Sequence, residues 1–178
     1  MLKTCVSGAT GWTGGAIASA VARAEDMELT SCVSRRAAGQ QVMEAPCFAS
    51  VDQALAGPDF DVLIDYSRPS KTDAPTGTAR ELAERMGDIK QPAFEVPPGE
   101  VAGEPGLRGG TVNGVQVHAL RLPSYSATVT STFAHGNSRL TITHDAGKDA
   151  TIYADGTLLA ARKVMEIEGL VRGLDRLL

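Results

Sequence analysis

The sequence has no apolar run close to the roughly 20 residues that a membrane-spanning helix requires, and it has no internal repeat or low-complexity tract. Its first strand pattern runs directly into a glycine-rich turn. That arrangement leaves no space for the apolar segment and cleavage site of a signal peptide. We therefore expect a cytoplasmic protein with no membrane partner.

Positive charge and cysteine are also scarce. The 17 lysines and arginines are outnumbered by 21 acidic residues, giving a formal net charge of −4. A general nucleic-acid binder needs a basic face to displace counterions, so a small molecule is the expected ligand. The three cysteines, Cys5, Cys32 and Cys47, cannot all pair and lack the close spacing of zinc ligands. We predict no metal site, and we expect Cys5 and Cys32 to be buried because they fall in predicted strands.

The remaining composition is that of a soluble globular chain. Apolar residues make up 43% of the sequence and charged residues 21%, close to the usual averages. A chain of 178 residues can bury a real core as one ordinary domain or as two small ones. We expect two small lobes.

Residues 1–36 have the clearest local pattern. A short apolar strand over Leu2–Ser7 is followed by the glycine turn Gly8–Gly14, an alanine-rich helix over Ala16–Ala24 and a second strand over Met27–Val33. Strand, glycine turn, helix and strand within about thirty residues form one βαβ unit. We predict the beginning of a Rossmann dinucleotide-binding fold.

The spacing Gly8-x-x-Gly11-x-x-Gly14 is what a pyrophosphate site requires. The glycines allow a tight turn and close approach of the backbone to phosphate, and the helix N-terminus supplies free N–H groups. A glycine turn without a ligand is the alternative. The predicted cofactor-binding residues here are Gly8, Thr10, Gly11, Trp12, Thr13 and Gly14.

Two arginines follow the second strand, where NAD-selective enzymes usually have an acidic residue for the ribose hydroxyls. The residues are Ser34, Arg35 and Arg36, which we add to the cofactor-binding set. Two guanidinium groups favour a 2′-phosphate, so NADPH is the expected cofactor, with NADH possible. A solvated basic corner is the alternative interpretation.

The rest of the chain predicts an α/β fold in two parts. A helix over Val51–Ala56, a strand over Phe60–Tyr66 and a helix over Ala79–Met86 capped by Thr76 or Thr78 come first. The second half alternates apolar and polar residues, which indicates an antiparallel sheet with one covered face. The strands expected there are Gly114–Leu122, Ala127–Phe133 and Arg139–His144, with Gly136-Asn137 as a turn.

We therefore predict an abbreviated N-terminal Rossmann-like parallel sheet and an α+β C-terminal domain with a mainly antiparallel sheet. The dinucleotide-binding domain is expected over residues 1–70. A C-terminal helix over about 156–178 is expected to pack back on it. The substrate-binding and oligomerisation domain is expected over residues 71–155.

The loop before the third predicted helix could bind a small anion. It reads Lys71-Thr72-Asp73-Ala74-Pro75-Thr76-Gly77-Thr78-Ala79 and places a lysine shortly before a helix N-terminus. Amides and hydroxyls of Thr76, Gly77 and Thr78 can bind a carboxylate, and Lys71 can contribute charge or a proton. A capped loop without a ligand is the alternative.

This loop resembles the Lys-x-Asp-Ala-Pro-Ser/Thr-Gly-Thr-Ala signature of the 4-hydroxy-tetrahydrodipicolinate reductase family. The glycine turn, the segment 60–69 and the segments 117–122, 140–145 and 156–163 are also similar to that family. The resemblance implies reduction of a cyclic imine-type dicarboxylate with NADPH or NADH, in the diaminopimelate route to lysine. It implies that Lys71 is catalytic, that Thr76, Gly77 and Thr78 hold a substrate carboxylate, and that the chain forms a homo-oligomer, a tetramer or dimer.

The chain departs from the family between Pro69 and Lys71, where a central segment is missing. That segment normally supplies a Gly-Thr-Thr turn beside the nicotinamide and a His-His pair. His118 and His144 are expected to be structural residues within strands and His135 to be exposed, so none replaces the pair. A non-catalytic nucleotide-binding or assembly homologue, and an imine reductase with a different substrate, remain alternatives. Acyl-phosphate reduction is another, and it would need Cys47 as an exposed nucleophile.

Overall fold

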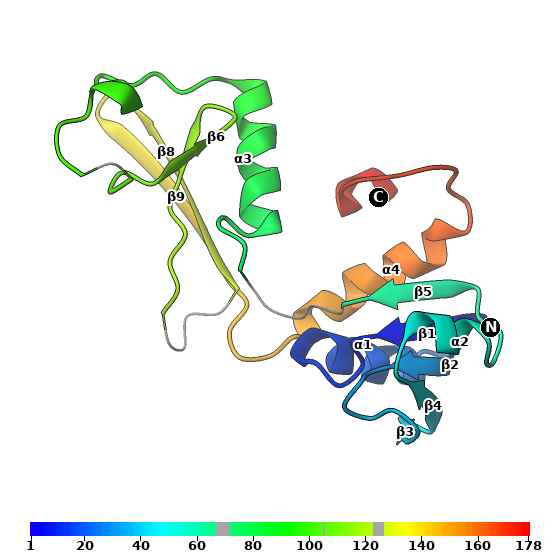
Figure 1. Ribbon diagram of the computed structural model, residues 1–178. Helices are drawn as coiled ribbons and strands as arrows, with labels where there is room; N and C mark the ends of the chain where they lie inside the picture. Colours follow the sequence, from blue (N-terminus) through cyan, green and yellow to red (C-terminus); the bar gives the residue numbers. More distant parts are fainter. Residues whose placement is uncertain (67–71, 105, 123–126) are drawn as a thin grey trace. The chain divides into compact units, whose positions relative to one another are not determined.

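The computed structural model describes residues 1–66, 72–104, 106–122 and 127–178. The chain forms two compact units (Figure 1). The first consists of Met1–Pro69 together with Lys148–Leu178, and the second consists of Ser70–Gly147. The C-terminal part of the first unit thus begins at Lys148, earlier in the chain than the position near 156 that the sequence predicted.

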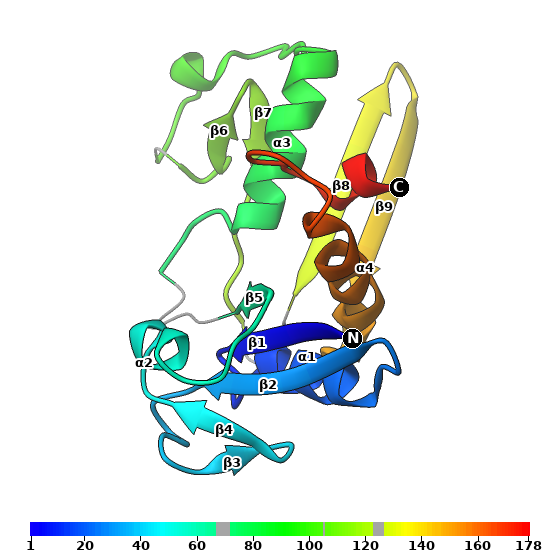
Figure 2. The ribbon, with the colours of Figure 1, turned by 90° about the vertical axis from the view of Figure 1, so that its right-hand side faces the viewer.

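The first unit contains a mostly parallel sheet in the order β3-β4-β2-β1-β5. β1 (Leu2–Ser7), β2 (Met27–Val33), β4 (Ala45–Phe48) and β5 (Val62–Asp65) are parallel, and β3 (Gln41–Val42) adds an antiparallel edge. The order reverses between β1 and β5, as Figure 2 shows. In open α/β sheets, ligands bind in the crevice at such a switch point, outside the carboxyl ends of the strands.

Helices cover both faces of this sheet. On one face α1 (Trp12–Arg23) and α4 (Ala154–Val164) pack against each other, with η2 (Thr151–Tyr153) leading into α4. On the other face α2 (Val51–Leu55) packs against β2 and β4. The strands divide their side chains between the two layers, as the two-residue period of a strand requires. Val6, Cys32 and Cys47 join the α1/α4 core, while Cys5 and Val33 join the α2 core.

Several sequence predictions for this unit are confirmed. β1 and β2 have the predicted bounds, and Cys5 and Cys32 are fully buried. Burial raises the pKa of the Cys32 thiol to about 12. α1 begins at Trp12, earlier than predicted, because the last residues of the glycine turn already form its first turn.

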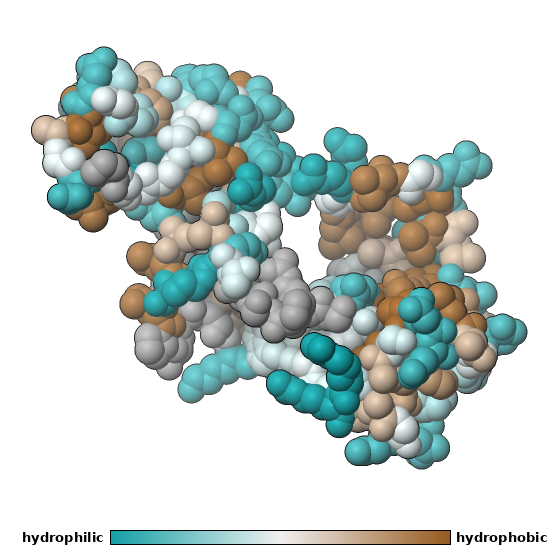
Figure 3. Space-filling view, in the orientation of Figure 1, coloured by the Kyte–Doolittle hydropathy of each residue, from teal (hydrophilic) through white to brown (hydrophobic). Residues whose placement is uncertain are grey.

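The predicted C-terminal helix over about 156–178 is too long. α4 ends at Val164, and only the short 3-10 helix η3 (Leu174–Leu177) follows. Gly169 and Gly173 have φ values of 82° and 93°, a conformation that cannot continue an α-helix. Figure 3 shows apolar side chains gathered over this last segment of the chain. Four of them are exposed: Leu170, Val171, Leu174 and Leu178.

An ion pair fixes α4 to the loop between α1 and β2. The Arg162 Nε and Nη2 atoms donate to the two carboxylate oxygens of Asp26 at 2.6 and 2.8 Å. These hydrogen bonds hold the pKa of the Asp26 carboxyl below its ordinary value. The returning C-terminal segment is thus attached to the N-terminal βαβ unit.

The second unit contains α3 (Gly77–Ile89), the short 3-10 helix η1 (Pro98–Glu100) and two antiparallel hairpins. The first hairpin, β6 (Gly110–Val112) and β7 (Val115–Val117), packs against α3. Its turn is Asn113-Gly114, with φ values of 46° and 78°, the combination that two-residue hairpins favour. The predicted strand over 114–122 was therefore wrong at both ends, since Gly114 is a turn residue and β7 stops at Val117.

The second hairpin pairs β8 (Thr128–His135) with β9 (Ser138–Asp145) through the predicted turn at 136–137. One face is a threonine ladder, with hydroxyl contacts Thr130–Thr143 and Thr132–Thr141 of 3.1 and 3.4 Å. The other face has the apolar residues Phe133, Leu140 and Ile142, which are 44%, 58% and 56% exposed. The expectation of a covered face was wrong for this chain by itself, because every residue of β9 is exposed.

Among the helices of the described residues, none is both long enough and apolar enough to cross a membrane. The predicted fold class is confirmed: a Rossmann-like parallel sheet is joined to a unit with antiparallel sheets.

Candidate functional site

The glycine turn brings the start of α1 against the end of β1. Gly8 has a φ of 79°, which favours glycine, and its carbonyl accepts the Gly11 amide at 2.8 Å. A Cβ atom at Gly14 would lie 2.1 Å from the Gly8 carbonyl oxygen, and one at Gly11 would lie 3.1 Å from it. A side chain at either position would overlap or crowd the Gly8 carbonyl. This tight turn therefore requires glycine at both positions.

The first turn of α1 fits an anionic ligand. Gly11 precedes the helix and provides no side-chain cap, and the first turn has no acidic residue. The first amides of an α-helix have no intrahelical acceptor, and they lie at the positive end of the helix dipole. The amides of Trp12, Thr13 and Gly14 are therefore suited to phosphate oxygens.

The structure brings the second predicted cofactor motif directly beside this turn. The amides of Gly8 and Ala9 donate to the Val33 carbonyl at 2.9 and 3.3 Å. The Thr10 and Ser34 hydroxyls lie 2.5 Å apart, and the Arg36 amide donates to the Ser34 hydroxyl at 3.3 Å. Arg35 and Arg36 follow as exposed residues just beyond the carboxyl end of β2. The predicted glycine and arginine motifs form one continuous surface.

A pair of hydroxyl side chains near the switch point, Tyr66 and Thr157, was missed by sequence reasoning. The Tyr66 and Thr157 hydroxyl oxygens lie 2.8 Å apart, and the Thr157 hydroxyl donates to the Tyr153 carbonyl at 2.7 Å. The Tyr66 amide also donates to the Ser7 carbonyl at the end of β1, at 3.0 Å. No local pattern could have found this group, because Tyr66 and Thr157 are 91 positions apart.

The predicted substrate-binding residues lie at the start of α3 in the second unit. Thr76 is the N-cap, and its hydroxyl accepts the Ala79 amide at 3.3 Å. Gly77 and Thr78 are exposed in the first turn, which has no acidic residue. Lys71, the predicted catalytic residue, lies outside the described residues. The loop before the cap is held by Arg121, whose guanidinium donates to the Asp73 carbonyl and lies 3.9 Å from its carboxylate.

The chain matches two models of one protein family. The family model described as "Dihydrodipicolinate reductase, N-terminus" matches residues 2–86. The model described as "Dihydrodipicolinate reductase, C-terminus" matches residues 46–178. The chain belongs to the dihydrodipicolinate reductase family. The resemblance predicted from the sequence is confirmed.

Individual relatives within the dihydrodipicolinate reductase family cover the chain only in part. The 4-hydroxy-tetrahydrodipicolinate reductase of Desulfitobacterium hafniense (strain Y51) is 36% identical over 116 residues, 65% of this chain and 43% of that protein. That of Mycobacterium marinum is 38% identical over 125 residues, 69% of this chain and 51% of that protein. The chain thus spans about half the length of the curated relatives it matches.

A solved structure supports the fold of this family member. It is described as dipicolinate-bound dihydrodipicolinate reductase from Paenisporosarcina sp. TG-14. The TM-score is 0.69 at 19% sequence identity, and the match covers 100% of both chains. At this identity the match supports the architecture of the chain.

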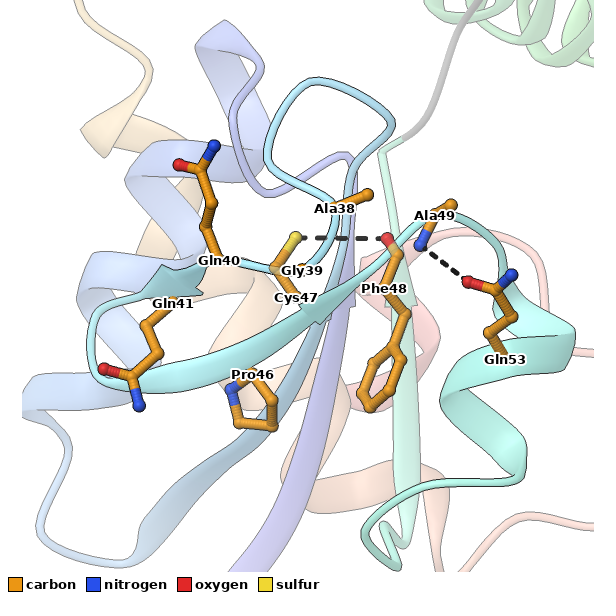
Figure 4. A pocket seen from close by; sticks show the side chains of 9 residues that line it. All are labelled: Ala38, Gly39, Gln40, Gln41, Pro46, Cys47, Phe48, Ala49 and Gln53. Atoms are coloured by element: carbon orange, nitrogen blue, oxygen red, sulfur yellow. Dashed lines mark hydrogen bonds between the residues drawn. The ribbon is translucent and has the colours of Figure 1, made fainter.

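Cys47 does not have the surroundings of a nucleophile. Its side chain is buried beside an open hollow that is lined from β3, β4 and the start of α2 (Figure 4). The Sγ atom lies 3.8 and 3.9 Å from the Ser34 and Phe48 carbonyl oxygens. Burial raises the pKa of the Cys47 thiol, whereas a nucleophilic cysteine needs a lowered one. The acyl-phosphate alternative is therefore wrong for this residue.

The three histidines of this family member are all exposed. His118 lies just after β7, so the expectation of a structural histidine within a strand was wrong. His144 lies within β9 as predicted, but its side chain is on the exposed apolar face rather than in a core. His135 ends β8 and is exposed, as expected. None of them lies in the first unit beside the glycine turn.

Proposed function

We propose that this chain binds NADPH at the glycine turn and reduces a cyclic imine-type dicarboxylate in the diaminopimelate route to lysine. The observation that supports it best is the continuity of the two cofactor motifs. The Thr10–Ser34 contact of 2.5 Å joins the glycine turn to the arginines beyond β2. Family membership supplies the reaction class, and the proposed enzyme is cytoplasmic.

The residues of the first unit would hold the cofactor at its adenosine end. The amides of Trp12, Thr13 and Gly14 would bind the pyrophosphate, with Gly8 and Gly11 allowing close approach. Arg35 and Arg36 would bind the 2′-phosphate, because guanidinium groups form strong, often bidentate, hydrogen bonds with phosphate. When bound, NADPH supplies the hydride.

The residues of the second unit would bind the substrate. The amides of Gly77 and Thr78 and the Thr76 hydroxyl would hold a carboxylate at the start of α3. Lys71 would protonate the imine nitrogen, which makes the C=N bond a better hydride acceptor. The contact between Arg121 and Asp73 would keep this loop in place.

The choice of cofactor gives the first test. The double variant Arg35→Ala/Arg36→Ala should bind NADPH about 10- to 100-fold more weakly, because charge-assisted hydrogen bonds to phosphate are lost. Its affinity for NADH should stay within about twofold, since NADH has no 2′-phosphate. Isothermal titration with both nucleotides measures the two dissociation constants. The matched control is Arg23→Ala, at the far end of α1.

Equal loss of NADPH and NADH binding in the double variant would contradict binding of the 2′-phosphate by the arginines. It would indicate that they stabilise the folded protein instead. Wild-type protein that binds NADH more tightly than NADPH would contradict the NADPH assignment. A control variant that behaves like the double variant would mean that general positive charge, and not this position, supports binding.

A non-catalytic nucleotide-binding or assembly homologue is the second candidate. The matches cover only about half of each relative, and a homologue of this kind would keep the glycine turn without the segment beside the nicotinamide. Following NADPH absorbance with the family substrate separates the candidates. Turnover supports the reductase, and NADPH binding without turnover supports the second candidate. Turnover only with other cyclic imines would indicate an imine reductase with a different substrate.

We also propose a homo-oligomer, a tetramer or dimer, formed through the apolar face of β8 and β9. An isolated two-stranded ribbon is marginally stable in water, and this one exposes Phe133, Leu140 and Ile142. A second copy would cover these side chains. No nucleic-acid or membrane partner is part of this proposal.

Placing a lysine on that face should dissociate the oligomer. Ile142→Lys is expected to weaken self-association about 10- to 100-fold, because the burial of one isoleucine side chain in the interface is lost. Thr141→Lys adds the same charge to the opposite face and should leave the oligomer intact. Size-exclusion chromatography with light scattering measures both. A wild-type monomer at micromolar concentration, or equal effects of the two lysines, would overturn the assignment.

A further inference from the structure

Trp12 has two long-range attachments in addition to its place at the start of α1. Its indole Nε1 donates a hydrogen bond to the Lys148 carbonyl at 3.0 Å, across 136 positions of sequence. Its ring also meets the Tyr153 ring edge to face, with centroids 6.2 Å apart and planes at 74°. The side chain is nevertheless 48% exposed, so burial alone does not account for its position.

Lys148 is the residue at which the chain returns to the first unit. We call residues 148–153 the re-entry segment. Within it, the Asp149 carboxylate accepts the Thr151 amide at 2.8 Å, and the Tyr153 amide donates to the Ala150 carbonyl at 3.1 Å. These local contacts shape the segment, while Trp12 attaches both ends of it to the glycine turn.

The attachment continues to the other side of the switch point. The Tyr153 carbonyl accepts the Thr157 hydroxyl, whose oxygen lies 2.8 Å from that of Tyr66 at the end of β5. Trp12, the re-entry segment and Tyr66 therefore form one chain of contacts around the carboxyl ends of β1 and β5.

We propose that Trp12 is a positioning residue that couples binding of a nucleotide pyrophosphate at the glycine turn to order in the re-entry segment. Trp12 takes part in both sites. Its main-chain amide belongs to the proposed phosphate-binding first turn of α1, and its indole N–H donates to the Lys148 carbonyl. An anchored indole keeps the turn in its binding-competent form, and a bound pyrophosphate in return fixes the indole. This inference rests on the proposed NADPH function.

The variant Trp12→Phe tests the anchor, because it keeps an aromatic ring and removes the indole N–H. Without nucleotide, amides of the re-entry segment should exchange with solvent hydrogen about three- to tenfold faster than in wild type. This factor corresponds to the net free energy of one neutral hydrogen bond. The NADPH dissociation constant, measured by titration calorimetry, should rise by a similar factor. NADPH should protect the re-entry segment in wild type and fail to do so in the variant.

Two further measurements make the test specific. Tyr153→Phe is the matched control, because it keeps the ring and the main-chain carbonyl, and it should exchange and bind like wild type. Trp12 is the sole tryptophan, so NADPH should change the wild-type indole emission directly. This spectroscopic signal reports the environment of the indole, independently of enzymatic turnover.

Each outcome separates the inference from the proposed function. Equal amide exchange in Trp12→Phe and wild type would overturn the anchor. Faster exchange with an unchanged NADPH affinity would overturn the coupling and leave a structural contact. If wild-type protein does not bind NADPH, the proposed function fails, and the exchange rates of the nucleotide-free proteins still decide whether Trp12 anchors the segment.

Discussion

Replacing Gly14 by alanine is expected to destabilise the first unit and to abolish NADPH binding. The new Cβ atom would lie 2.1 Å from the Gly8 carbonyl oxygen and 2.6 Å from its carbonyl carbon. Both neighbours are backbone atoms, so no side chain can rotate away to relieve the overlap. The first turn of α1 must instead retreat from β1, and the amides of Trp12 and Thr13 move with it.

Two effects of this retreat can be measured. Overpacking of this kind reduces the free energy of unfolding by about 1–3 kcal/mol, and a clash between backbone atoms should lie at the upper end. Losing two charge-assisted hydrogen bonds to phosphate should weaken NADPH binding at least about 100-fold. Urea denaturation and titration calorimetry give the two quantities.

Gly15→Ala provides the matched control in the same helix turn. Its Cβ atom would lie 3.3 Å from the Ala9 carbonyl oxygen, a tight contact that a shift of a few tenths of an ångström relieves. Alanine also favours the helix over glycine by up to about 1 kcal/mol. We expect its stability to stay within about 1 kcal/mol of wild type. Normal NADPH binding by Gly14→Ala would contradict both the turn geometry and the proposed site.

The parts of the fold that could be predicted are those with local signals. β1 and β2 were predicted with their observed bounds, because each is a short apolar run ending at a glycine or polar turn. The cap of α3 was predicted as Thr76 or Thr78, and Thr76 is the observed N-cap. The cofactor motifs were predicted as two separate segments, and parallel pairing of β1 with β2 brings them together.

Other features depend on contacts that no local pattern reveals. The hydrogen bond between Trp12 and Lys148 joins residues that are 136 positions apart in the sequence. Gly169 and Gly173 adopt positive φ values beyond the end of α4, whereas other glycines of this chain, such as Gly15, lie within helices, so the presence of glycine does not predict where the helical region ends.

The hairpin of β8 and β9 shows a further limit of sequence patterns. Alternation correctly separated the threonine face from the face with Phe133, Leu140 and Ile142. Alternation identifies which face is apolar, but it contains no information about what covers that face. In the part of the chain that the structure describes, the apolar side chains of this face are exposed, so the oligomer must be tested in solution.

Lys71→Ala is expected to reduce kcat/KM about 100- to 10,000-fold, the usual contribution of a positioned proton donor. Lys71 lies outside the described residues, so this expectation rests on the family signature and on the residues that follow it. Thr76 caps α3, and Arg121 holds Asp73, so the loop after the lysine has a defined form. NADPH binding should be unchanged, because the cofactor residues lie in the first unit.

A second variant separates proton donation by Lys71 from the effect of its positive charge. Lys71→Arg keeps the positive charge, but a guanidinium group does not release a proton at neutral pH. It should therefore preserve KM for the dicarboxylate more closely than kcat. Lys90→Ala, at the other end of α3, is the matched control and should leave both constants unchanged. If Lys71→Ala keeps kcat/KM within about threefold, protonation by this lysine is excluded as a rate-limiting contribution.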